Sequence, residues 1–123
     1  MSQNIKQRII TEIDRELDKR KKTYPNMILA EKLTRENANL YFLRLKAVQQ
    51  YFETGTIGNI HLPDMMTELK RELAMRHAYY KVQIAKDRMD AVTAATKIML
   101  MQEAVNLLSA DMCVNIPKQG ELF

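Results

Sequence analysis

The chain has 123 residues, a formal net charge of +4 and a single cysteine. That length provides one domain with one core, and a lone cysteine excludes an intramolecular disulfide, which fits a reducing compartment. Three glycines, three prolines and no tryptophan, among many Leu, Met, Ala, Lys and Glu residues, predict an all-α chain.

The positive charge lies in the first half of the chain and is modest. Residues 1–55 hold eleven Lys or Arg against seven Asp or Glu, whereas residues 56–123 hold eight of each. Because acids alternate with bases almost throughout, the pattern is more typical of solvated helix faces than of a dedicated nucleic-acid binder. The first residues lack the apolar stretch of a signal peptide, and no run is long enough to span a membrane. We therefore expect a cytoplasmic protein.

The chain contains an internal duplication. Residues 11–38 align on residues 67–94 without a gap, at a constant offset of 56. Each copy carries an apolar seam followed by a return helix, so the duplication predicts two tandem helical hairpins packed as a four-helix arrangement. The identical pairs are Thr11/Thr67, Glu12/Glu68, Arg15/Arg71, Glu16/Glu72, Leu17/Leu73, Arg20/Arg76, Tyr24/Tyr80, Ile28/Ile84 and Ala38/Ala94.

In chain order, the first hairpin is predicted over residues 1–53, with Pro25 kinking or restarting its first helix. A linker is expected at 54–64, where "ETGTIGNIHLPD" holds two glycines and a proline and ends at Asp64, the expected cap of the third helix. The second hairpin is predicted over 65–109 and an extended C-terminal tail over 110–123. Thr34 and Asp90 occupy equivalent positions and are predicted to cap the two return helices.

No set of residues predicts catalysis, a cofactor or a metal. His61 and His77 have no Cys, His or carboxylate at the spacing of metal ligands. The sequence also lacks a glycine-rich phosphate loop, a nucleophile elbow and a Cys-His pairing. We therefore expect a protein that is not an enzyme.

Two pairs of charged residues recur in both copies, namely Glu16 with Arg20 and Glu72 with Arg76. On an exposed helix face such i,i+4 pairs contribute a few tenths of a kcal/mol each. Both arginines, however, fall on the apolar seam, where they would stack on the tyrosine one turn later or reach the carbonyls that end another helix. A third interpretation is a paired binding surface for an acidic partner, formed by Glu16, Arg20, Tyr24, Glu72, Arg76 and Tyr80.

The densest basic run is "DKRKK", residues 18–22. Such a run usually marks a solvated helix face. Its counterpart "AMRHA" has lost most of the charge, so any nucleic-acid role would belong to the first copy. The candidate phosphate contacts are Lys19, Arg20, Lys21, Lys22, Lys32 and Arg35.

Two stretches resemble known sequences. "EIDRELDKRKKTYP" and "RELAMRHAYY" resemble a helical module, roughly E-x-E-L-x-x-R-x-x-x-Y-P, of small phage and prophage proteins. This resemblance implies a mobile-element origin and no assigned chemistry. The final "QGELF" resembles the pentapeptide by which bacterial polymerases and accessory factors bind the β sliding clamp, although Gly120 stands where an apolar residue is usual.

The second resemblance implies roles for three residues. Gln119 would hydrogen-bond at the rim of the clamp's pocket, while Leu122 and Phe123 would bury their side chains in its apolar subsites. The expected function is then an accessory protein that recruits a factor to the clamp or inhibits access to it. Two alternatives remain open: the tail covers this protein's own hydrophobic groove, or it swaps between the subunits of a homodimer.

Overall fold

The computed structural model describes residues 4–115, without the side chains of residues 114 and 115. This part of the chain forms four α-helices and no strand. The helices are α1 (Ile5–Leu29), α2 (Arg35–Thr54), α3 (Leu62–Ala85) and α4 (Ala91–Asn115). The all-α prediction with two tandem hairpins is confirmed. The predicted tail beyond residue 115 lies outside the described residues.

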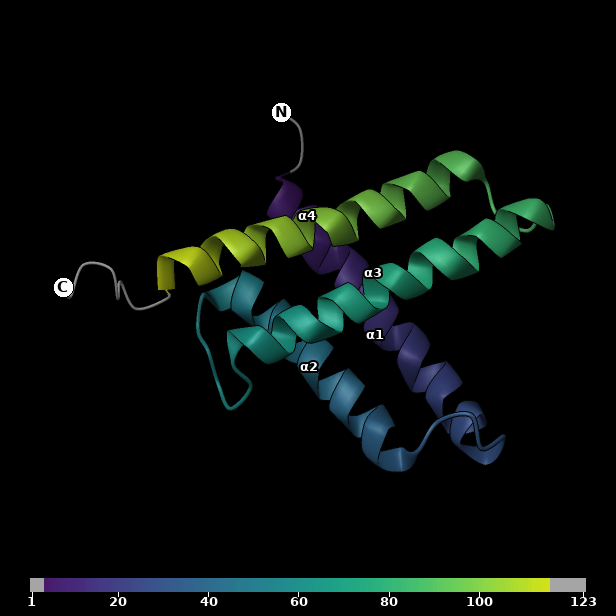
Figure 1. The fold of residues 1–123 in the computed structure, drawn as a ribbon, viewed down its shortest axis with the longest axis horizontal. Helices are drawn as coiled ribbons and strands as arrows, with labels where there is room; N and C mark the ends of the chain where they lie inside the picture. The colour runs from purple at the N-terminus through teal and green to yellow at the C-terminus, as the bar shows by residue number, and fades with distance from the viewer. Residues whose placement is uncertain (1–3, 116–123) are drawn as a thin grey trace.

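The two hairpins cross and diverge toward their turns, which lie at the upper and lower right of the view (Figure 1). α1 packs on α2 and on α4, and α3 packs on α4 and on α2. α1 and α3 therefore occupy one diagonal of the four-helix arrangement, and α2 and α4 occupy the other. In the duplication α1 corresponds to α3 and α2 to α4, so the α1–α4 contact of one copy corresponds to the α3–α2 contact of the other. This is the symmetry expected when a hairpin packs on its own duplicate.

The hairpin turns repeat the same backbone geometry at the offset of 56. Glu31 and Asp87 adopt left-handed conformations with φ of 58° and 57°. Their N–H groups donate to Ile28 and Ile84 carbonyls, both at 3.0 Å. The N–H group of the next residue donates to a backbone carbonyl five residues before it. The two hydrogen bonds together form the Schellman motif that ends many helices.

The predicted caps of the return helices are confirmed. Thr34 Oγ1 accepts a hydrogen bond from the Asn37 N–H at 3.0 Å, and Asp90 Oδ2 accepts one from the Thr93 N–H at 3.0 Å. These oxygens satisfy amides that have no partner within the first turn of a helix.

The predicted start of the third helix is wrong. α3 begins at Leu62 and not after Asp64, and its N-cap, His61, makes no side-chain cap bond. Pro63 lies in the first turn, where its fixed φ favours an earlier start. α1, in contrast, continues through Pro25 without restarting.

The second hairpin also extends beyond the predicted end at residue 109. α4 runs to Asn115 because its last turns still contact the body. Met112 packs on the hydrophobic core, and the Tyr51 hydroxyl donates to Asp111 Oδ2 at 2.9 Å. A tail beginning at residue 110 is therefore incorrect.

The hydrophobic core lies where the hairpins cross, toward the linker end of the molecule. Each helix contributes side chains at helical spacing, and complete burial of one Leu, Ile or Met contributes about 1.5–3 kcal/mol. Within residues 4–115 no helix is both long and apolar enough to cross a membrane. The core includes Ile9, Ile13, Leu17, Leu45, Val48, Phe52, Met65, Leu69, Met101, Ala104 and Leu108.

Candidate functional site

A network of buried charges continues the core toward the hairpin turns, on the α1–α3 diagonal. Arg20 of α1 is its first centre: Nη2 pairs with Glu72 at 2.7 Å and with Glu68 at 2.8 Å. Its Nε pairs with Glu16 at 3.1 Å, and Nη1 donates to the Tyr41 carbonyl of α2 at 2.9 Å. One guanidinium thus joins three helices.

Arg76 of α3 is the second centre and repeats the arrangement from the other copy. Its Nε pairs with Glu72 at 2.8 Å, and Nη1 pairs with Glu12 at 2.9 Å. Nη1 also donates to the Lys97 carbonyl of α4 at 3.0 Å, which is the position equivalent to Tyr41. Its Nη2 pairs with Glu16 at 3.5 Å, which is the longer counterpart of the 2.7 Å pair between Arg20 and Glu72.

We call these six residues the charge network: Glu12, Glu16, Arg20, Glu68, Glu72 and Arg76. Arg20 is 1% exposed and Glu68 is fully buried, so the network lies inside the protein. Within residues 4–115 no buried side-chain nitrogen or oxygen lacks a hydrogen-bond partner. Removing one member would therefore leave its partners without compensation in a medium of low polarity.

The pKa values of the equivalent residues Glu16 and Glu72 move in opposite directions. Burial and the nearby Glu72 carboxylate raise the pKa of Glu16 above its ordinary value of 4.5. For Glu72 burial acts in the same direction, but Arg76 and Arg20 outweigh it and lower the pKa. Ionised Glu72 therefore stabilises the fold above pH 4.5, and this contribution is lost as the pH falls through its lowered pKa. Ionised Glu16 carries a cost that appears as the pH rises through its raised pKa.

Sequence reasoning identified four members of the network and missed Glu12 and Glu68 as site residues. The signal was present, because Glu12, Glu16 and Arg20 follow one another at i,i+4 beside the apolar seam, and the same spacing recurs in the second copy. The expectation of exposed pairs is wrong for Arg20, Glu72 and Arg76, which are buried, while Glu16 is half-buried. Both arginines reach backbone carbonyls of another helix, although within it and not at its end.

A cleft of about 390 Å³, which we call the α1–α3 cleft, opens above the network between the diverging hairpins. All six residues proposed as a paired surface line it, and four of them, Glu16, Arg20, Glu72 and Arg76, belong to the charge network. The Arg20 and Arg76 guanidinium carbons lie 5.7 and 5.9 Å from the ring centres of Tyr24 and Tyr80. Burial raises the pKa of Tyr80 to about 12, so its hydroxyl stays protonated at neutral pH. The remaining walls are mostly apolar or aromatic: Met27, Leu33, Tyr41, Met75 and Tyr79.

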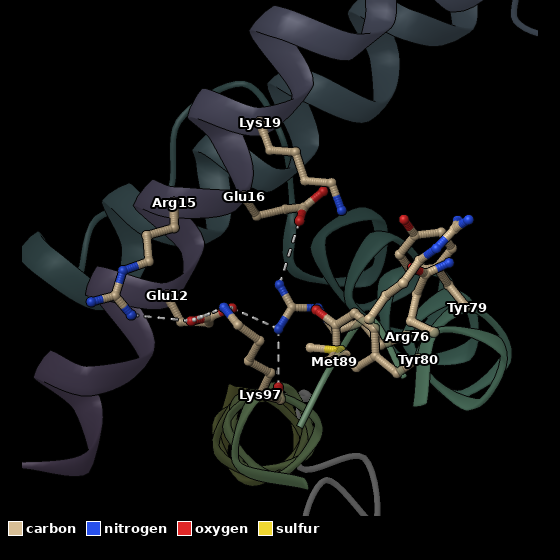
Figure 2. A pocket seen from close by; sticks show the side chains of 11 residues that line it. Glu12, Arg15, Glu16, Lys19, Arg76, Tyr79, Tyr80, Met89 and Lys97 are labelled. Carbon is tan, nitrogen blue, oxygen red and sulfur yellow. Dashed lines mark hydrogen bonds and ion pairs between the residues drawn. The ribbon is translucent and has the colours of Figure 1, made fainter. Parts of the chain in front are cut away.

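A second cleft of about 350 Å³, the basic cleft, adjoins the first and is bounded by α1, α3 and the start of α4. Figure 2 shows the Arg76 guanidinium at its centre, directed toward Glu16, Glu12 and the α4 backbone. The Lys97 ammonium lies beside Glu12 at 3.1 Å. The rim of the basic cleft carries Arg15, Lys19 and Arg88.

The two clefts are related by the duplication but differ in chemistry. Shifting a position on the α1–α3 cleft by 56, to its counterpart in the other copy, gives in most cases a residue of the basic cleft. The replacements change the lining from apolar or neutral to polar or charged. They are Tyr41/Lys97, Met27/Gln83 and Met75/Lys19, whereas Thr23/Tyr79 replaces a hydroxyl side chain by an aromatic one.

One of the predicted nucleic-acid contacts is not at the protein surface. Arg20 is buried in the charge network and is therefore unavailable to a phosphate. Lys19 and Lys21 are exposed and lie over aromatic rings, at 5.2 Å from the Tyr79 centre and 5.9 Å from the Phe42 centre. The other candidates, Lys22, Lys32 and Arg35, are exposed.

Gln119, Leu122 and Phe123 lie outside the described residues. His61 and His77 are exposed, and residues 4–115 contain no group of three or more His, Cys, Asp or Glu side chains arranged to hold a metal ion. No protein-family model, curated protein or solved structure matches the chain.

Proposed function

We propose that this protein is a non-enzymatic accessory factor that binds another protein through Gln119, Leu122 and Phe123, with a bacterial β sliding clamp as the partner. It would act in the cytoplasm of a bacterium, as the product of a phage or another mobile element. The observation that carries the proposal is the spacing of these three residues in "QGELF".

The chemistry of the pentapeptide supports this partner. A short segment that binds in an extended conformation gains affinity from a few buried side chains, and Leu122 and Phe123 provide two large apolar ones. Gln119 offers both a donor and an acceptor for the rim of a pocket. Gly120 contributes no side-chain contact, so we expect micromolar and not nanomolar affinity.

The structure of the body narrows the alternatives. The charged residues shared by both copies already have partners within the chain, and their contacts account for how the hairpins pack. A structural role is sufficient for Arg20 and Arg76, so their recurrence in both copies does not require a partner at that position.

The direct test is a calorimetric titration of purified β clamp with the full-length protein. The Leu122→Ala, Phe123→Ala double variant should abolish binding, whereas Glu121→Ala, at a variable position of the pentapeptide, should bind like the parent. Helicity and melting temperature are measured for each variant.

Two outcomes would overturn the proposal. The first is an absence of binding by the parent protein at concentrations well above the micromolar range. The second is binding that the double variant retains. A melting temperature lowered by the double variant, without any clamp binding, would instead assign Leu122 and Phe123 to the protein's own hydrophobic groove.

A further inference from the structure

Basic side chains follow the flank of α1 that faces α4. Arg8, Arg15 and Lys19 recur at intervals of seven and four, so they share one helix face and span about 16 Å along the axis. Arg8 and Arg15 line a hollow of about 350 Å³ with Lys97, and Arg15, Lys19 and Lys97 continue into the basic cleft. Arg88 extends the same row at the hairpin turn.

The acids on this flank do not neutralise the row. Glu12 is buried and its carboxylate is held by Arg76 and Lys97, and Glu16 is directed to Arg20 and Arg76. The Arg15 side chain is 68% exposed, and its distance to Glu12 is 3.5 Å. The exposed cations therefore keep most of their attraction for an anionic ligand.

The equivalent flank of the second hairpin provides an internal comparison. The positions of Arg8 and Lys19 are occupied there by Asp64 and Met75, and Tyr41 stands where Lys97 does. Arg71, the counterpart of Arg15, is drawn inward: it pairs with Glu68 at 2.7 Å, and its guanidinium carbon lies 3.6 Å from the Tyr41 ring centre. The basic row is thus a property of one flank and not of the hairpin as such.

An aromatic ring stands where the basic row meets the α1–α3 cleft. Tyr79 lines both clefts and is 52% exposed, with the Lys19 ammonium 5.2 Å from its ring centre. Beyond it the α1–α3 cleft is lined by further tyrosines and methionines. Cations that track a phosphate backbone, next to aromatic rings on which bases stack, are the features by which proteins bind single-stranded nucleic acids.

We propose that the basic row and the adjoining α1–α3 cleft form one binding surface for single-stranded nucleic acid. The phosphates lie along Arg8, Arg15 and Lys19, and an unpaired base stacks at Tyr79. A duplex keeps its bases paired and stacked inside, so it would contact only the basic row. Of the contacts predicted from the sequence, this surface shares only Lys19, and it does not involve the QGELF segment.

The test measures fluorescence anisotropy of a labelled oligothymidylate of about 12 nucleotides, and of a duplex of equal length, with the full-length protein over a range of salt concentrations. Two variants introduce the residue that the other copy carries at the equivalent position, Lys19→Met and Tyr79→Thr. Lys70→Met is the matched control, because it removes the same charge from an exposed site on α3 that lines neither cleft.

Lys19→Met should weaken oligothymidylate binding several-fold at low salt and lower the slope of log affinity against log salt by about 0.7. Tyr79→Thr should weaken binding about tenfold and leave that slope unchanged. Lys70→Met should bind like the parent, and the Leu122→Ala, Phe123→Ala variant should also retain binding. That last result separates this surface from the clamp proposal.

Three results would overturn the proposal. One is no binding to the oligonucleotide at low salt. Another is an equal loss in Lys19→Met and Lys70→Met, which would mean that net charge alone is responsible. The third is tighter binding to the duplex, together with no effect of Tyr79→Thr. Circular dichroism and melting curves of the three variants show whether each one remains folded.

Discussion

Replacing Arg20 by methionine tests whether the charge network holds the two hairpins together. Methionine keeps much of the apolar stem but removes a guanidinium that contacts Glu16, Glu68, Glu72 and the Tyr41 carbonyl. Removing one partner of a buried ion pair costs about 3–5 kcal/mol. Glu68 and Glu72 retain second cationic partners, which keeps the expected loss within that range.

The loss in the free energy of unfolding is measured by urea unfolding at pH 7, with circular dichroism as the readout. A domain of this length loses roughly 3–6 °C of melting temperature per kcal/mol, so Arg20→Met should melt about 10–25 °C lower. Arg76→Met, at the equivalent position, should fall in the same range. The control is Arg44→Met, whose partially exposed pair with Asp64 is 3.4 Å long and should contribute less than about 1 kcal/mol. An Arg20→Met loss no larger than that of Arg44→Met would refute the reasoning.

Three further predictions concern the duplicated elements and the end of α4. At pH 7 Glu72→Gln should destabilise the protein more than Glu16→Gln, because the pKa of Glu72 is lowered and that of Glu16 is raised. The difference in the free energy of unfolding between the two variants should narrow below pH 4.5 in urea titrations. Glu31→Gly and Asp87→Gly should each raise the free energy of unfolding by about 0.5–1 kcal/mol, since both residues have positive φ, and unchanged values would contradict this. Tyr51→Phe should cost about 0.5–1.5 kcal/mol in the same assay, because its hydroxyl donates to a carboxylate of α4, and no loss would argue against that contact.

Much of the fold was predictable because the chain carries two copies of the same pattern. The gapless offset of 56 implied equivalent hairpins before any helix was located, and the structure repeats that equivalence in its caps and turn dihedrals. Thr34 and Asp90 differ chemically, yet each provides an oxygen acceptor at the helix start. The left-handed residues Glu31 and Asp87 gave no sequence signal, since glycine is the usual residue at that position.

The network was only partly predictable because its partners come from different copies. Periodicity assigns Glu16 and Arg20 to one face of a helix, but it does not say which helix lies across from that face. Arg20 is completed by Glu68 and Glu72, which are more than 45 residues away and on the diagonal helix. The i,i+4 spacing favoured an exposed pair, whereas the crossing of the hairpins buries it. The end of α4 was missed for a related reason, because its last turns are stabilised by tertiary contacts.

The positions that stayed alike between the copies and those that diverged lie in different parts of the structure. The identical pairs Glu12/Glu68, Glu16/Glu72 and Arg20/Arg76 form the buried network, where a change on one side would leave a charge on the other side without its partner. The differing pairs Lys19/Met75 and Tyr41/Lys97 lie at the clefts, where a substitution alters the chemistry of the lining without breaking the network. Two equal hairpins can thus share one base while their clefts differ in chemistry. It follows that exchanging Lys19 and Met75 should remove one charge from the basic cleft, keep one at the α1–α3 cleft and leave stability nearly unchanged. Urea unfolding and the oligonucleotide assay would measure the two effects together.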